Sequence, residues 1–407
     1  MKKVPLQIVI TNVVALNAGD GAILLGIIKV LRRTFDNFNL TVLDSQATIA
    51  RRLYPEIQFE QLALKTNYRG VAGRIWRALV KYLGNQRRWL PSYSRNIATY
   101  NNADLIISTG GTYLVEHYDL SDRMYQLAFV AASRQPLIMY TQSLGPFTKP
   151  NTIKWLQTLM PQVDLVLLRD ERSAANLNQI GANAKKMKVV ADAAFALANV
   201  ERVKAGITRS LGKELRVAVS VRSWKHFRSS HVGEALNNYY DGIAKTVEKL
   251  VSERGAAVTF ISTCQGVPEY WTDDSKAARE IMSLIDPEVR KRVTLNADFH
   301  RAEELMEILA GFDMAIATRM HLGILSLCAA TPVFPIAYEF KTTELFTNLG
   351  LGEWVIEIEG ANSSTLPDKV ISFLDNLPVI RPKLMESVLS LYESAMTVAD
   401  MLPAVTG

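Results

Sequence analysis

Short apolar segments alternate with helix-like stretches in two separate series along this chain, and no other feature constrains the fold as strongly. The first series places strand candidates at residues 6–11, 40–43, 105–108, 136–140 and 165–168. A charged, weakly patterned stretch follows at 199–214, and the second series then has candidates at 216–221, 257–262, 292–295, 314–317 and 333–336. Strands that alternate with helices build βαβ units, whose parallel sheets are covered on both faces.

The two series predict an α/β protein with two Rossmann-like lobes that face a central cleft. We place the lobes at residues 1–200 and 201–382, and a last helix at 383–407 could return to the first lobe. The 407 residues, of which 48% are hydrophobic, are enough for two cores. Open sheets of this type bind ligands outside the carboxyl ends of their strands, so the loops after the strands are the candidate sites.

The positive charge of the chain is concentrated in one segment. The net charge is +6, yet no acidic residue occurs between Glu60 and Asp104. Residues 65–95 interleave Lys and Arg with apolar residues at helical spacing, which predicts a basic amphipathic helix. Three interpretations stay open: an ordinary solvated helix face, a surface for anionic lipid or a pyrophosphate-linked lipid head, and a nucleic-acid site. We expect no nucleic acid, because no RNA- or DNA-binding motif accompanies the charge.

Several classes of site and location are disfavoured by the sequence. The only cysteines are Cys264 and Cys328, and no Cys/His cluster has zinc-like spacing, so we expect reduced thiols and no metal. No segment reaches the roughly 20 apolar residues that span a bilayer. The apolar stretch after Met1 is interrupted by Gln7 and Thr11 and is better explained as a first strand than as a signal peptide. We therefore expect a cytoplasmic protein that could lie on the inner face of the plasma membrane.

Polar and glycine residues follow four strands of the first series. Such residues can bring backbone close to a ligand, and a helix start favours an anion. Each loop also has a plain structural alternative: a tight turn for the paired glycines, and helix capping for Asp20 and for Asp170 with Ser173. The residues in question are Asn17, Asp20, Gly110, Gly111, Gln142, Arg169 and Asp170.

The second series carries the more informative loops. Arg222 leaves an apolar strand, where a buried cation needs an anion or an acceptor as its partner. A second apolar strand runs directly into Thr318-Arg319-Met320-His321 and then into an apolar helix. Arginine and a helix start both favour carboxylate or phosphate, and a histidine there can act as an acid or a base near neutral pH. The alternatives are a structural salt bridge for Arg222 and a buried, backbone-bonded ring for His321.

These loops together resemble the polysaccharide pyruvyl transferases, most closely the colanic-acid type of bacterial exopolysaccharide synthesis. The likeness runs in order over about residues 6–350. It comprises residues 17–20, 110–111, 142–147, 169–173, 262–266, 318–321, 330–332 and 338–341. One departure is Ala193, where the family often has a proline after the aspartate at 192.

The resemblance implies a glycosyltransferase-B-like fold without cofactor, and phosphoenolpyruvate as the donor. The acceptor would be a sugar of an exopolysaccharide repeat unit, expected to be lipid-linked. The products would be a pyruvate ketal and phosphate. We expect Arg222, Arg319, Ser262, Gln265, Glu339 and Lys341 at the donor and Asn17, Gly110, Gly111, Gln142 and Arg169 at the acceptor.

The same resemblance implies the chemical roles. His321 would protonate the methylene carbon of the donor, and Asp20 or Asp170 would deprotonate the acceptor hydroxyl; the residues leave the choice between them open. Two other functions remain possible for this fold: a nucleotide-sugar-dependent glycosyltransferase, in which Arg319 would meet the diphosphate and Glu339 the ribose, and a non-catalytic saccharide-binding module.

Overall fold

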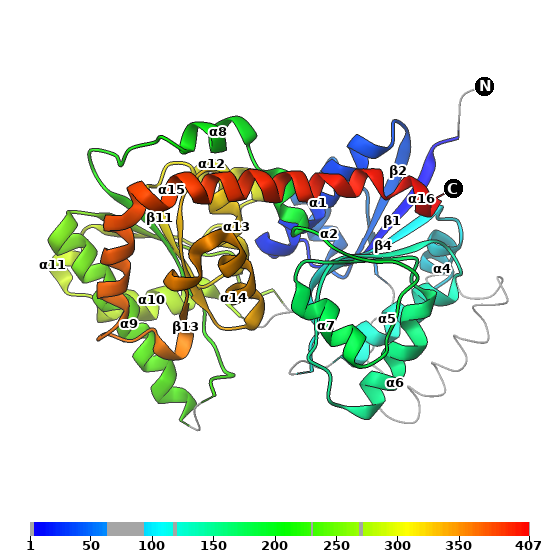
Figure 1. Ribbon diagram of the computed structural model, residues 1–407, viewed down its shortest axis with the longest axis horizontal. Helices are drawn as coiled ribbons and strands as arrows, with labels where there is room; N and C mark the ends of the chain where they lie inside the picture. Colours follow the sequence, from blue (N-terminus) through cyan, green and yellow to red (C-terminus); the bar gives the residue numbers. More distant parts are fainter. Residues whose placement is uncertain (1–3, 63–92, 117–119, 229–230, 268–271, 407) are drawn as a thin grey trace. The chain divides into compact units, whose positions relative to one another are not determined.

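A computed structural model describes residues 4–62, 93–116, 120–228, 231–267 and 272–406 of the chain (Figure 1). Contacts divide the chain into two compact units. The first comprises Met1–Ala15, Ile27–Ala193 and Met396–Gly407, and the second comprises Leu16–Gly26 and Ala194–Ala395. The start of the first helix therefore belongs to the second unit, whereas the domain limits expected from the sequence assigned it to the first.

The first unit is built on a seven-stranded parallel sheet with the order β3-β2-β1-β4-β5-β6-β7. Its strands are β1 (Leu6–Val13), β2 (Phe38–Asp44), β3 (Phe59–Gln61), β4 (Leu105–Leu114), β5 (Leu137–Leu144), β6 (Leu165–Leu168) and β7 (Met187–Val189). The helices of this half of the chain are α1 (Ala18–Thr34), α2 (Ala47–Leu53), α4 (Tyr93–Asn101), α5 (Ser121–Ala132), α6 (Pro150–Leu159) and α7 (Glu171–Gln179).

The second unit is built on a six-stranded parallel sheet with the order β10-β9-β8-β11-β12-β13. Its strands are β8 (Arg216–Ser220), β9 (Ala257–Ile261), β10 (Val293–Asn296), β11 (Met314–Ala317), β12 (Val333–Ala337) and β13 (Ile356–Glu357). Its helices are α8 (Val200–Gly206), α9 (Val232–Arg254), α10 (Asp274–Leu284), α11 (Pro287–Arg290), α12 (Ala302–Leu309), α13 (Met320–Cys328), α14 (Phe340–Phe346) and α15 (Leu366–Met396).

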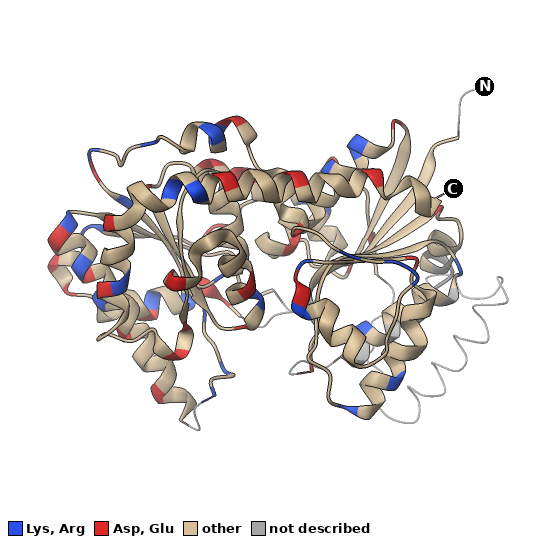
Figure 2. Cartoon of the chain, viewed as in Figure 1, with Lys and Arg blue, Asp and Glu red and all other residues tan. Residues whose placement is uncertain are grey.

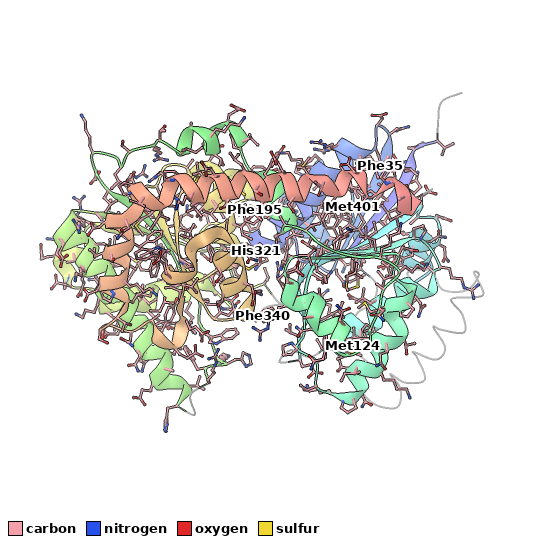
Figure 3. All side chains as sticks on the ribbon, viewed as in Figure 1. Phe35, Met124, Phe195, His321, Phe340 and Met401 are labelled. Carbon is pink, nitrogen blue, oxygen red and sulfur yellow. The ribbon has the colours of Figure 1, made fainter. Side chains whose placement is uncertain are left out.

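Burial on both faces explains the apolar strands. All eight residues of β5 and all four residues of β11 are buried, as parallel strands covered by helices require. Figure 2 shows the charged residues mainly on helices and loops, with the strands largely uncharged. Figure 3 shows side chains filling the space between each sheet and its helices. The prediction of two parallel α/β sheets is confirmed.

The expected last helix differs from the structure in its bounds, and the expected basic helix lies mostly outside the described residues. The last long helix begins at Leu366 rather than at 383 and contains Pro378 and Pro382. It ends at Met396, and the short helix α16 (Pro403–Thr406) follows. Most of the expected basic amphipathic helix at 65–95 falls in residues 63–92, outside the described part of the chain.

The paired glycines of β4 provide a test of the fold. A Cβ added at Gly110 would lie 1.7 Å from the carbonyl oxygen of Thr141 on β5. Because this neighbour is backbone, we expect Gly110→Ala to lower the free energy of unfolding by at least about 3 kcal/mol in urea titrations. Gly233→Ala is the control, since no heavy atom lies within 4 Å of its added Cβ. Equal stability of the two variants would contradict this packing.

Candidate functional site

The second sheet reverses its strand order between β8 and β11, which pair directly with one another. Helical connections leave these two strands in opposite directions, and ligands of open α/β sheets bind at such a switch point. Arg222 follows the carboxyl end of β8, and Arg319 and His321 follow the carboxyl end of β11. The topology therefore brings all three predicted residues to one edge of the sheet.

Arg222 is held by aromatic rings. Its Cζ atom lies 4.8 Å from the ring centroid of Trp224 and 4.4 Å from that of Tyr338, and the two rings are 4.6 Å apart. The Nε atoms of Arg222 and the indole Nε1 of Trp224 are buried without a hydrogen-bond partner among the described residues. Aromatic faces attract a guanidinium but do not neutralise it, so Arg222 keeps its positive charge within the site.

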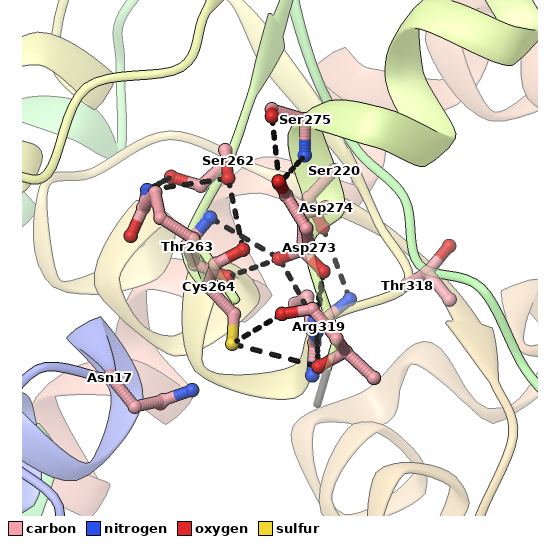
Figure 4. Close-up of polar contacts among 12 residues, drawn as sticks. Asn17, Ser220, Ser262, Thr263, Cys264, Asp273, Asp274, Ser275, Thr318 and Arg319 are labelled. Carbon is pink, nitrogen blue, oxygen red and sulfur yellow. Dashed lines mark hydrogen bonds and ion pairs between the residues drawn. The ribbon is translucent and has the colours of Figure 1, made fainter. Parts of the chain in front are cut away.

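Arg319 is held by a carboxylate instead (Figure 4). Its Nε atom donates to both oxygens of Asp274, at 2.9 and 3.0 Å, and its second terminal nitrogen pairs with Oδ1. Its side chain is 12% exposed and that of Asp274 is 2% exposed. Burial alone would lower the pKa of Arg319, but the Asp274 carboxylate raises it above the ordinary arginine value. Arg319 therefore keeps its charge, and the Asp274 carboxylate lies against it as the counter-charge.

Asp274 also fixes the loop after β9. Its Oδ2 atom accepts hydrogen bonds from the backbone nitrogen of Thr263, at 3.3 Å, and from its hydroxyl, at 3.1 Å. The carbonyl oxygen of Thr263 in turn accepts from the backbone nitrogen of Ala18, the first residue of α1, at 3.2 Å. A continuous set of contacts therefore joins Arg319 to the start of α1.

His321 is the second residue of α13 and lies against the start of α1 (Figure 3). A Cβ added at Gly19 would lie 2.7 Å from the ring nitrogen Nδ1 of His321, so only glycine leaves room for the imidazole. Both helix starts direct partial positive charge toward this region, which favours an anion there.

The capping residue of α1 is Asn17 rather than Asp20. The Asn17 Oδ1 atom accepts from the backbone nitrogens of Gly19, at 3.0 Å, and of Asp20, at 3.3 Å. Asp20 stands in the first turn of α1, beside the residue that contacts His321.

The other residues predicted at the donor order their own loops. Gln265 Nε2 donates to the carbonyl and hydroxyl oxygens of Ser262, at 3.1 and 3.2 Å. Lys341 and Glu339, at the start of α14, form an ion pair at 2.6 Å with both side chains largely buried. These contacts order the loops at the edge of the sheet. The ion pair also neutralises Lys341 and Glu339, two of the charged residues predicted at the donor.

The residues predicted at the acceptor in the first unit are also engaged internally. Gly110 accommodates the backbone of β5, and Gly111 has φ 147°, a conformation that favours glycine. Gln142 Nε2 donates to the carbonyl oxygen of Thr109 at 2.8 Å. Packing between neighbouring strands accounts for these residues without a ligand.

Arg169 and Asp170 belong to one buried network of the first unit. Arg169 donates to the Ser143 hydroxyl at 2.7 Å and pairs with Asp192 at 2.5 Å. Asp170 accepts from the Ser143 hydroxyl at 2.7 Å and, as the cap of α7, from the backbone nitrogen of Ser173 at 2.7 Å. Both Asp170 oxygens are occupied, so the capping alternative considered for this residue is observed.

Sequence reasoning missed two residues of the site. Asp274 lies 45 positions before Arg319, and nothing in its surroundings distinguishes it from an ordinary helix-start acid. Trp224 follows Arg222 by two positions in a loop without regular pattern. An arginine leaving a buried strand did signal that a partner was needed, but only the fold shows that this partner is aromatic for Arg222 and acidic for Arg319.

Two features are absent from the described residues: a metal-binding cluster and a membrane-spanning helix. No group of three or more His, Cys, Asp or Glu side chains is placed to hold a metal ion within the part of the chain that the structure describes. No helix in the described ranges is long and apolar enough to cross a membrane.

Sequence comparison relates the chain to a protein family and to a known protein. The family model for polysaccharide pyruvyl transferase matches residues 17–339. The amylovoran biosynthesis protein AmsJ of Erwinia amylovora is 25% identical over 389 residues, which cover 91% of this chain and 92% of AmsJ. The matched region includes the Asn17 loop, Arg222, Asp274, Arg319 and His321.

Solved structures share the fold at low sequence identity. A glycosyltransferase from Rickettsia africae has a TM-score of 0.61 at 10% identity, covering 98% of each chain. Anabaena HepE, solved in complex with UDP and glucose, has a TM-score of 0.57 at 13% identity and also covers 98% of each chain. The predicted glycosyltransferase-B-like fold is therefore confirmed.

The contact between Gly19 and His321 can be tested without reference to any activity. We expect Gly19→Ala to displace the imidazole, change the NMR signals of His321 and lower the free energy of unfolding by about 1–3 kcal/mol. In a His321→Ala background the same glycine substitution should cost much less, because the clashing ring is gone. An equal cost in both backgrounds would show that the ring does not occupy this position.

Proposed function

The chain belongs to the polysaccharide pyruvyl transferase family, and from this premise we propose that it transfers pyruvate from phosphoenolpyruvate to a sugar of a bacterial exopolysaccharide repeat unit. The products are a pyruvate ketal and inorganic phosphate. The observation that carries the proposal is the meeting of an uncompensated cation, Arg222, and two helix starts at the switch point that holds His321.

Phosphoenolpyruvate suits this arrangement because it places a carboxylate and a phosphate on three carbon atoms. Arg222 offers the donor a positive charge that no described carboxylate neutralises. The starts of α1 and α13 supply backbone dipoles that favour the second anionic group. Arg319 contributes less charge than the sequence suggested, because Asp274 neutralises it.

The reaction then needs one acid and one base. Protonation of the methylene carbon by His321 leaves a cationic centre at C2, which the first acceptor hydroxyl attacks. Departure of phosphate regenerates that centre, and the second hydroxyl attacks it to close the ketal. The base takes the proton of the first hydroxyl and passes it to His321, which returns to its starting state. The proton of the second hydroxyl leaves with the released phosphate.

Asp20 is the better candidate for the base. It follows Gly19, which contacts His321, and stands in the first turn of α1. Asp170 is less suitable, because its two oxygens already accept from Ser143 and Ser173. We assign Asn17, Ser262, Gln265, Glu339 and Lys341 to shaping the loops of the second unit around these groups.

Kinetics test the roles of His321 and Arg222. We expect His321→Ala to lower kcat about 10²–10⁴-fold in a phosphate-release assay, since it removes the general acid. Arg222→Leu should instead raise the KM for phosphoenolpyruvate about tenfold or more, because it removes a charge-assisted contact. His300→Ala is the matched control, as the described side-chain bond of His300 is to Asn296.

Mass spectrometry of the acceptor decides between this function and its alternatives. A pyruvylated saccharide must appear after incubation with phosphoenolpyruvate and candidate acceptors. Turnover of a UDP-sugar with no reaction of phosphoenolpyruvate would favour a nucleotide-sugar glycosyltransferase, the activity of several structural neighbours by name. Saccharide binding without any phosphate release would favour a binding module.

We further propose that the acceptor is lipid-linked and that the chain meets an anionic membrane. The support is the basic segment at 65–95, which contains no acidic residue. We expect the protein to sediment with anionic vesicles at low salt and to be released at high salt, because electrostatic attraction is screened. Binding to neutral vesicles that is insensitive to salt would contradict the electrostatic origin.

A further inference from the structure

Asp274 contacts Arg319, which directly precedes α13, and Thr263, whose carbonyl oxygen holds the start of α1. These two helices carry the proposed acid and base. We propose that Asp274 is a positioning residue: its carboxylate holds Arg319 on one side and Thr263 on the other, and so fixes the starts of α13 and α1 relative to each other. The kinetic consequences of this inference rest on the proposed function. The expected change in phosphate binding does not.

The contacts on the Arg319 side set the start of α13. Arg319 is the residue immediately before that helix, and its backbone nitrogen donates to the Ser220 hydroxyl at 3.1 Å. With Nε and a terminal nitrogen held by Asp274, and a further bond to the Thr272 hydroxyl at 3.2 Å, the arginine has little freedom to turn. The direction in which His321 leaves the helix start is therefore tied to Asp274.

The contacts on the Thr263 side set the start of α1. Asp274 accepts from the backbone and hydroxyl of Thr263, whose carbonyl holds Ala18. Gly19 and Asp20 follow Ala18 directly, and the His321 ring lies on Gly19. One carboxylate thus determines both the position of the imidazole and the position of the aspartate beside it.

Capping of α10 does not explain Asp274. The helix begins at Asp274, but its cap is the preceding residue, Asp273, whose Oδ1 accepts from the backbone nitrogen and hydroxyl of Ser275 at 2.9 and 2.7 Å. Among the described contacts, Asp273 bonds to Ser275 and not to Arg319, whereas Asp274 bonds to Arg319 several times. Two adjacent aspartates therefore serve different purposes, which provides a matched pair for experiment.

Asp274 neutralises Arg319 in addition to holding it in place, and this neutralisation affects how strongly the site binds anions. With Asp274 ionised, Arg319 adds no net charge to the site. Loss of that charge in Asp274→Asn would leave Arg319 with uncompensated N–H groups, which small anions can then bind. The variant should bind inorganic phosphate more tightly while it catalyses the reaction more slowly.

The experiment compares Asp274→Asn with Asp273→Asn, since both changes remove one charge at nearly constant volume. For Asp274→Asn we expect kcat to fall about 100-fold through misplacement of the reacting groups, and phosphate affinity, followed by thermal shift, to rise about tenfold. Asp273→Asn should leave both quantities near their original values, because asparagine also caps helices well.

A double variant shows whether a fall in kcat comes from misplaced reacting groups or from loss of folding. Asp274→Asn with Arg319→Gln contains no uncompensated charge, so it should fold and lose the added phosphate affinity while kcat stays low. Its KM for phosphoenolpyruvate should change by less than about threefold, because Arg222 provides the donor contact. Unchanged kcat in Asp274→Asn, or phosphate affinity that does not rise, would overturn the proposal. If the unmodified protein does not use phosphoenolpyruvate, the proposed function fails, but the phosphate titration still tests Asp274.

Discussion

The ion pair between Arg319 and Asp274 is the interaction on which the arrangement of the site depends. It lies at the carboxyl edge of the second sheet, where the loops after β8, β9 and β11 meet. Through Thr263 it reaches the start of α1, which therefore packs as part of the second unit. A buried pair of this kind contributes little net stability, because desolvation offsets most of the attraction. Its value here is geometric: it leaves one arrangement for the groups around His321.

Arg319 and Arg222 differ in their partners, and the partners decide whether the arginine charge is neutralised. A carboxylate neutralises Arg319 and makes it a fixed support. The rings of Trp224 and Tyr338 hold Arg222 in place and leave its charge available to a ligand. The same type of side chain is thus neutralised in one loop and keeps its charge in the other, and the neighbouring residues decide which.

Polar residues after the strands of the first unit follow another logic. Arg169 pairs with Asp192 and donates to the Ser143 hydroxyl, which donates to Asp170, the cap of α7. Gln142 bonds to the backbone of β4. Buried polar groups must find partners, and these find them within the unit. Polar residues in the loop after a strand therefore do not by themselves identify a binding site in an open α/β sheet.

The sequence by itself determined the fold class, most of the strands and the edge of the sheet at which Arg222, Arg319 and His321 meet, because burial on both faces of a parallel sheet leaves apolar runs that can be recognised locally. It did not reveal β3, β7 or β13, since strands of two or three residues at a sheet edge have no periodicity. Only the tertiary structure decided that Asp274 neutralises Arg319, that aromatic rings hold Arg222, that Asn17 caps α1 and that Asp170 is occupied as a cap. Those outcomes depend on contacts between residues far apart in the chain, and local pattern carries no information about which distant side chain will satisfy a buried charge.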